Sequence, residues 1–334
     1  MSVKWMKARP EMLVKRVSRR ALRERFREVL HHLPLAAKKP CEDVEHVHRL
    51  RVACRRAVAA LDIFEPALPP KRARRMRKEL RRLRRAVGQA RDLDVLAQRL
   101  ERLLAAGENG AISKVLQRVV KLRKKAQPAA RQAYRRARRR QLGREMRRLA
   151  KRSRHPAGLS GSFGSYAREG LRRNTRDFFA AAGADLTDIE NLHQLRIAGK
   201  RLRYAMEIYA GAFSSALRYE LYPVFAEVQE RLGTINDYAT AVRLLDTWQQ
   251  AVSSKSSAGR MQNLLEDENR RLEKAAAAFR QWWTPARAAS LKHQFDQLVA
   301  GPQPAEEREK SAAERKIPLS AARVGPSLVS SVST

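Results

Sequence analysis

Apolar residues recur at three- and four-residue spacing along most of the chain, and this period predicts α-helices. Two clear runs are Leu80, Leu83 and Val87, and Leu221, Phe225, Val228 and Leu232. The strict apolar–polar alternation of strands, bounded by turn residues, is not found. We therefore predict an all-α protein, with helices over residues 9–33, 44–65, 71–87, 91–106, 110–153, 163–183, 187–212, 215–232, 234–252 and 257–283.

Proline and glycine suggest where this helical pattern is interrupted. Pro128 permits a kink in the longest helix, and the segment 153–165, rich in Gly, Ser and Pro, is the best internal boundary. From Gly301 onward, Pro, Ser, Ala and charged residues replace the apolar period, so 301–334 is predicted to be a disordered tail.

An internal repeat links the two sides of that boundary. Residues 45–56 align with residues 190–201, a shift of 145 positions, and both segments contain His-x-x-Arg. The same shift, with no gap, aligns 87–92 with 232–237. A single shift without gaps over three predicted helices is not expected by chance. We therefore expect two copies of a roughly four-helix unit, 9–153 and 163–300, packed as one pseudo-symmetric bundle.

The repeated helices carry basic stripes. At about 100° per residue, three basic residues of the first copy fall within one sector of about 60°, and Leu50, Cys54, Ala57 and Leu61 lie on the other side. The stripe of the first copy consists of His48, Arg51 and Arg55, with Arg56 at its flank. That of the second copy consists of His193, Arg196, Lys200 and Arg203, with Arg201 at its flank. Further stripes contain Arg16, Arg20, Arg23 and Arg27 on the first helix, and Lys78 and Arg81 on the third. Such stripes on neighbouring helices predict a basic central groove or pore.

The net charge points to a polyanionic partner. The chain has 71 Lys and Arg against 34 Asp and Glu, a net charge of +37. Residues 1–160 hold 47 of these basic and 14 of the acidic side chains. A chain with this much like charge repels itself unless an anion neutralises it. Basic residues one helical turn apart can donate charge-assisted hydrogen bonds to successive phosphates of a long, flexible anion.

Several other classes of protein are disfavoured. No run approaches the roughly 20 apolar residues needed to span a bilayer, and no secretory signal is visible, so we expect a cytoplasmic protein. Cys41 and Cys54 form no CxxC or Cys/His cluster and are expected to be packing residues. Phosphate-loop, G-x-S-x-G and HExxH motifs are missing, so we expect a protein that is not an enzyme and needs neither cofactor nor metal.

Two aspartates at matching positions allow two interpretations. Asp92 and Asp237 each follow a Gly that is expected to end a helix. They can cap the next helix or bond a neighbouring Arg. The alternative is a metal site formed with His48 and His193.

The repeated H-x-x-R-x-x-x-[RK]-R helix, followed by [LV]-G-x-x-x-D, resembles the CHAD family, the conserved histidine α-helical domain, over residues 9–300. This resemblance implies a helical bundle with two-fold pseudosymmetry whose basic groove or pore binds inorganic polyphosphate, in some members at polyphosphate granules. The binding residues that it implies are His48, Arg51, Arg55, Arg56, His193, Arg196, Lys200, Arg201 and Arg203.

The main alternative is a protein that binds nucleic acid without sequence specificity, since such a charge attaches a protein to DNA or RNA at low salt. Against it, residues 1–160 contain few aromatic side chains on which bases could stack: Trp5, Phe26, Phe64 and Tyr134. A third possibility is a structural protein that uses 110–153 as a basic anchor to a granule or nucleoid. That segment lacks an apolar face wide enough for membrane insertion.

Overall fold

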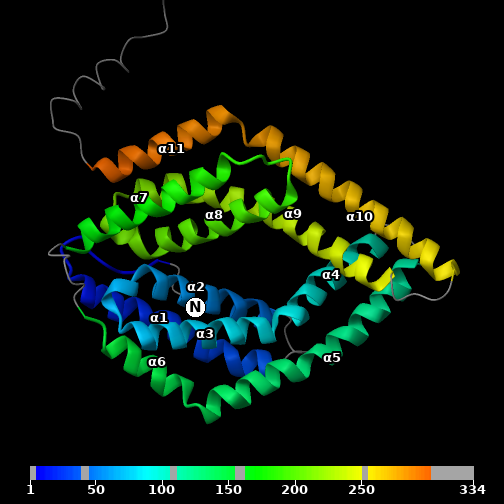
Figure 1. Cartoon of the computed structure of the whole chain (residues 1–334), viewed down its shortest axis with the longest axis horizontal. Helices are drawn as coiled ribbons and strands as arrows, with labels where there is room; N and C mark the ends of the chain where they lie inside the picture. Colours follow the sequence, from blue (N-terminus) through cyan, green and yellow to red (C-terminus); the bar gives the residue numbers. More distant parts are fainter. Residues whose placement is uncertain (1–4, 39–44, 106–110, 155–161, 250–254, 302–334) are drawn as a thin grey trace, which may run out of the picture. The chain divides into compact units, whose positions relative to one another are not determined.

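The computed structural model describes residues 5–38, 45–105, 111–154, 162–249 and 255–301, and these residues form helices and turns without a β-strand. The all-α prediction is confirmed. The first half contains α1 (Val14–Lys38), α2 (Glu45–Ile63), α3 (Pro70–Ala86), α4 (Gly88–Ala105), α5 (Ala111–Arg139) and α6 (Leu142–Lys151). The second contains α7 (Phe163–Ala182), α8 (Ile189–Tyr209), α9 (Tyr222–Gln249), α10 (Lys255–Trp282) and α11 (Pro285–Ala300) (Figure 1).

The helices of the two halves follow the same register. The shift of 145 residues that aligns the motifs also carries α2 onto α8 and α5 onto α10, to within two residues at each end. In Figure 1, α7, α8 and α11 lie on one side of the bundle and α1, α2, α3 and α6 on the other. The two-fold relation between the halves, and a groove or pore between them, stay predictions.

The helix break expected near Gly233 is wrong. Helix α9 runs through Gly233 without interruption, after a π-helical turn at Leu217–Leu221. In the first half the chain does break, at Val87 between α3 and α4. A glycine inside a helix costs only about 1 kcal/mol, and Leu232 and Ile235 are buried on either side of Gly233. Their packing favours the continuous helix.

Two further boundaries differ from the prediction. Helix α5 continues through Pro128 and ends at Arg139, and Gln141 adopts a left-handed conformation, with φ 49°, before α6. Helix α11 was not predicted, although Leu291, Phe295 and Val299 form a buried stripe on it. Residues 302–334 of the expected tail and 155–161 of the expected boundary lie outside the described residues.

Helix α2 lies at the centre of the packing. It contacts α1, α3, α4 and α8, and its buried face contains Val47, Leu50, Ala53, Cys54, Ala57, Ala60 and Leu61. Cys54 is fully buried, as its predicted packing role requires, and burial raises the pKa of its thiol to about 12. Cys41 lies outside the described residues. None of the described helices combines the length and apolarity needed to cross a membrane.

A buried ionic cluster joins the two halves. Glu207 of α8 is 1% exposed, and its carboxylate forms an ion pair of 2.9 Å with Arg56 of α2. Arg25 of α1, also 1% exposed, lies 3.6 Å from the same carboxylate. The hydroxyl of Tyr222 donates a hydrogen bond of 3.0 Å to it. Since a buried charge without a partner is strongly unfavourable, these contacts fix α8 against α1 and α2.

We expect Glu207→Gln to destabilise the protein by about 3–5 kcal/mol, because it removes the buried carboxylate that Arg56 and Arg25 share, although Arg25 keeps its pair with Glu28 at 3.4 Å. The matched control is Glu169→Gln, which removes an exposed partner of Arg172 and should cost less than about 1 kcal/mol. Urea unfolding followed by circular dichroism gives both values. Similar losses in the two variants would show that the buried cluster does not hold the halves together.

Candidate functional site

The two copies of the His/Arg motif lie on helices that contact each other, α2 and α8. Asp188 begins α8 by accepting a hydrogen bond of 2.9 Å from the backbone N–H of Glu190, which fixes the register of the motif that follows. Between the helices, Nε of Arg55 donates a hydrogen bond of 3.2 Å to the hydroxyl of Tyr204. The fold thus brings the two predicted stripes together.

Five half-buried cations gather where these helices meet, and we call them the α2–α8 cation cluster: Arg51, Arg55, Arg196, Lys200 and Arg203. Burial lowers the pKa of Arg196, and the nearby charges of Arg55 and Arg51 lower it further, while Asp237 opposes them. Like charges from both halves are therefore close enough to repel one another.

Two donors of this cluster lack an acceptor. Nε of Arg196 and Nε of Arg203 are buried, and neither has a hydrogen-bond partner among the described residues. A buried donor without a partner costs about 1–3 kcal/mol, more when charged. Such donors are satisfied when an anion with several acceptor oxygens binds beside them.

Lys200 is the most perturbed cation of the cluster. Burial, followed by the charges of Arg196, Arg55 and Arg203, lowers its pKa to about 6, while Asp237 acts in the opposite direction. The Lys200 amine is consequently largely neutral at pH 7 in the ligand-free protein.

The histidines of the motif lie half-buried beside the cluster. Burial lowers the pKa of His48, and Arg91 lowers it further, while Glu45 opposes them. His48 is therefore a neutral imidazole at pH 7, able to donate or accept a hydrogen bond but not to add a charge. His193 takes the equivalent position on α8.

Asp92 bonds an arginine of the cluster. Its carboxylate lies 3.7 Å from the guanidinium of Arg51, which agrees with the Arg-bonding interpretation. The same guanidinium packs against Gly88, where a Cβ would lie 3.2 Å from Arg51 Nη1. Within the described part of the chain, no group of three His, Cys, Asp or Glu side chains could hold a metal.

Not all predicted site residues belong to the cluster. Arg56 bonds the buried Glu207, so its guanidinium already serves the fold. Arg201 is exposed on α8. Lys78 and Arg81 line a separate open hollow of about 540 Å³ on α3, which also contains Arg77 paired with Asp62 at 2.6 Å.

The predicted stripe on α1 is not among the groups that act most strongly on the cluster. Its members are exposed: Arg16, Arg20, Arg23 and Arg27. Arg20 bonds Glu24 at 3.2 Å and the carbonyl of Lys7 at 2.9 Å. The charges that act most strongly on Arg51, Arg196 and Lys200 come instead from α2, α3, α4, α8 and α9.

Three further arginines lie near the cluster and were not predicted from the sequence. Arg84 of α3 and Arg91 of α4 act on Arg51, and Arg243 of α9 acts on Asp92. Arg91 could have been found, because it lies within the repeated Gly-x-x-x-Asp motif. Arg84 and Arg243 lie outside both motifs, and only the packing of α3 and α9 brings them near.

Comparison with known proteins identifies the family. The model of the CHAD domain matches residues 20–246, more than half of the chain. This chain belongs to the CHAD family. Its fold is similar to the crystal structure of the CHAD domain from the plant Ricinus communis, with 23% identity, 91% of this chain and 97% of that chain covered, and a TM-score of 0.65. It is also similar to PptA from Streptomyces chartreusis, with 20% identity, 81% and 99% covered, and a TM-score of 0.60. No curated protein matches the sequence significantly.

The lowered pKa of Lys200 in this CHAD domain gives the stability a defined pH dependence. Between about pH 6 and the ordinary lysine pKa of about 10.4, the unfolded chain binds a proton at Lys200 that the folded protein does not. The contribution of Lys200 to the free energy of unfolding therefore rises with pH across this window. Relative to wild type, Lys200→Met should be most stabilised near pH 6 and lose this advantage towards pH 10. Urea unfolding across the window measures the difference, and exposed Lys78→Met is the control. A pH-independent difference for Lys200→Met would contradict the assignment.

Proposed function

We propose that this CHAD protein binds inorganic polyphosphate through the α2–α8 cation cluster. The observation that carries the proposal is the pair of buried guanidinium donors without acceptors, Nε of Arg196 and Arg203, in a cluster with few carboxylates. A chain of phosphates supplies closely spaced anionic oxygens, which match both the charge and the hydrogen-bonding need of these groups. The CHAD family, to which polyphosphate binding is ascribed, supports the same ligand.

Each residue of the proposed site has a distinct role. Arg51, Arg55, Arg196 and Arg203 bind phosphate oxygens, and Lys200 adds a further positive charge once an anion favours its protonated form. The imidazoles of His48 and His193 add hydrogen bonds. Arg56 positions α8 through Glu207. The exposed arginines of α1, together with Lys78, Arg81 and Arg201, attract the same anion over a longer range.

We further propose that the protein acts by binding alone, without cofactor or metal, in the cytoplasm at polyphosphate granules. The cluster offers cations and hydrogen-bond donors, but no paired carboxylate and nucleophile arranged for phosphoryl transfer among its members. Nucleic-acid binding without sequence specificity is the second candidate. The charge of +37 favours it, whereas the half-buried position of the cluster favours a thin, flexible anion over a duplex.

The double variant Arg51→Ala/Arg196→Ala should weaken binding of long-chain polyphosphate by roughly a hundredfold or more, since hydrogen bonds to charged groups contribute about 1.5–3 kcal/mol each. Arg138→Ala/Arg139→Ala removes the same formal charge from exposed positions on α5 and should change affinity only slightly at about 0.15 M salt. Fluorescence anisotropy with labelled polyphosphate measures both affinities, after melting curves confirm that both variants fold. Equal losses would mean that binding follows net charge alone.

Competition distinguishes polyphosphate from nucleic acid. At about 0.15 M salt and equal phosphate concentration, polyphosphate should displace duplex DNA, because nonspecific DNA contacts weaken steeply with salt. The polyphosphate recovered from the mixture should keep its length on a gel, as expected of a protein without hydrolase activity. DNA that stays bound against excess polyphosphate would favour the second candidate, and chain shortening that depends on His48 or His193 would make the protein an enzyme.

A further inference from the structure

A pocket of about 930 Å³ lies between α7, α10 and α11, and no member of the α2–α8 cation cluster lines it. Its wall includes the apolar side chains of Phe179, Leu186, Trp283 and Ala288. Trp283 is 6% exposed and packs against Phe178 and Phe279, which hold the indole in place. The pocket has the size and apolar wall typical of small-molecule sites.

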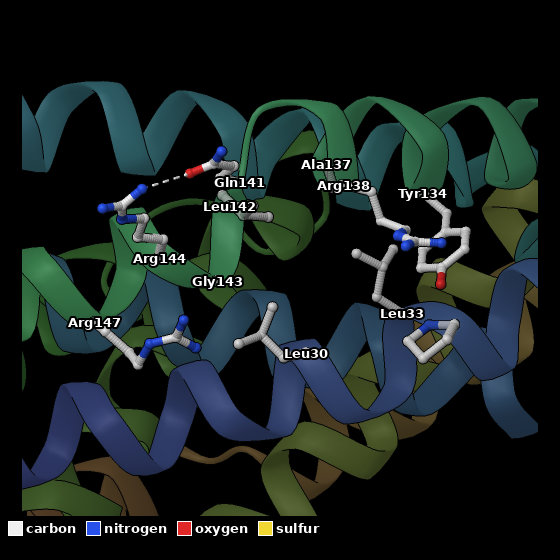
Figure 2. A pocket seen from close by; sticks show the side chains of 11 residues that line it. Leu30, Leu33, Tyr134, Ala137, Arg138, Gln141, Leu142, Gly143, Arg144 and Arg147 are labelled. Carbon is white, nitrogen blue, oxygen red and sulfur yellow. Dashed lines mark hydrogen bonds between the residues drawn. The ribbon is translucent and has the colours of Figure 1, made fainter.

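The first half has a counterpart of this pocket, with a different wall. A pocket of about 490 Å³ lies between α1, α5 and α6 (Figure 2). The shift of 145 residues carries six of its lining residues onto lining residues of the larger pocket. In order, Leu30, Pro34, Arg138, Gly143, Arg144 and Arg147 correspond to Thr175, Phe179, Trp283, Ala288, Ala289 and Lys292. Equivalent positions of the two copies thus line the two pockets. Where the smaller pocket has Arg138 and Arg144, the larger one has Trp283 and Ala289, so its wall is more apolar.

One polar group in the larger pocket lacks a partner. Thr175 is only 4% exposed, lines the pocket and has no hydrogen-bond partner for its hydroxyl among the described residues. Buried hydroxyls are almost always hydrogen-bonded, so an unpaired one requires an explanation. A ligand oxygen in the pocket would accept this hydrogen bond.

The charges at the rim favour an anion. Arg176, adjacent to Thr175 on α7, is exposed and forms no ion pair with a described residue. Arg280 donates a hydrogen bond of 3.5 Å to the carbonyl of Leu186. The other basic residues of the rim are already paired, Arg172 with Glu169 at 2.9 Å and Lys292 with Asp296 at 3.1 Å. Asp185 accepts hydrogen bonds from Thr187. The charge of Arg280 also acts on the carboxylate of Asp185. Arg176 is therefore the guanidinium that lies beside the apolar wall without an ion-pair partner among the described residues.

We propose that this pocket binds a small amphipathic carboxylate of the fatty-acid class. The apolar body lies against Phe179 and Trp283, while the carboxylate accepts hydrogen bonds from Arg176 and from the hydroxyl of Thr175. Inorganic phosphates lack the apolar body and uncharged lipids lack the anion, so neither matches both parts of the pocket. This ligand is independent of the polyphosphate proposed for the α2–α8 cation cluster.

Isothermal titration calorimetry of the full chain with dodecanoate tests the proposal. Dodecanoate is kept below the concentration at which it forms micelles. We expect saturable binding, with much weaker binding of dodecanol and of acetate, which each keep one half of the ligand. Arg176→Ala should weaken dodecanoate binding about tenfold, and Thr175→Val about threefold. Thr175→Val should leave the melting temperature unchanged or raise it, because it removes an unpaired buried hydroxyl. A threonine with a merely structural hydrogen bond would instead lower the melting temperature when replaced.

The control is Arg173→Ala, which removes an exposed arginine of α7 that does not line the pocket. Ala289→Trp, which fills the pocket from α11, should abolish dodecanoate binding while helicity is retained. The proposal is overturned if Arg173→Ala and Arg176→Ala weaken binding equally, if dodecanol binds as tightly as dodecanoate, or if Ala289→Trp still binds. The pocket could instead be filled by a second copy of the chain, and light scattering tests this by measuring the molecular mass. If the wild-type protein is a dimer and Ala289→Trp is a monomer, the pocket belongs to a dimer interface and the proposal is overturned.

Discussion

The ion pair between Glu207 and Arg56 is the contact on which the arrangement of the site depends. It places α8 against α2, so that stripes encoded 145 residues apart meet at one interface. Other buried carboxylates also join helices. Asp94 of α4 pairs with Arg123 of α5 at 2.6 Å. Glu268 of α10 pairs with Arg99 of α4 at 2.8 Å. In a chain with more than twice as many basic as acidic residues, carboxylates used in this way leave the α2–α8 cation cluster with few counter-charges.

This distribution of charge destabilises the ligand-free protein and favours the binding of an anion. Arg51, Arg55 and Arg196 repel one another in the ligand-free protein, and burial strengthens the repulsion. Sites that hold groups in such unfavourable positions are commonly stabilised by the rest of the fold. Here the surrounding apolar face of α2 and the buried contacts of Glu207 supply that stability.

The sequence predicted what depends on local periodicity and missed what depends on contacts between helices. The helical class and most helix positions followed from apolar spacing, and the meeting of α2 with α8 agrees with the repeated motif. The predicted helix end at Gly233 was wrong because the packing of buried Leu232 and Ile235 outweighs the low helix propensity of one glycine. The role of Arg56 could not be predicted, since its partner Glu207 lies 151 residues away and outside the motif. Nor does any periodicity show that Lys200 loses its charge, because the cause is the proximity of arginines from another helix.

The neutral amine of Lys200 makes the proton a second ligand of the site. A polyanion that binds beside Lys200 favours its charged form, and a protonated Lys200 in turn favours the polyanion. Thermodynamic linkage requires the two effects to be equal, so the factor by which the anion strengthens proton binding is also the factor by which protonation strengthens anion binding. A single half-buried lysine thereby couples the occupancy of the site to the acidity of its surroundings, a coupling that a cluster of arginines alone could not provide because they stay protonated.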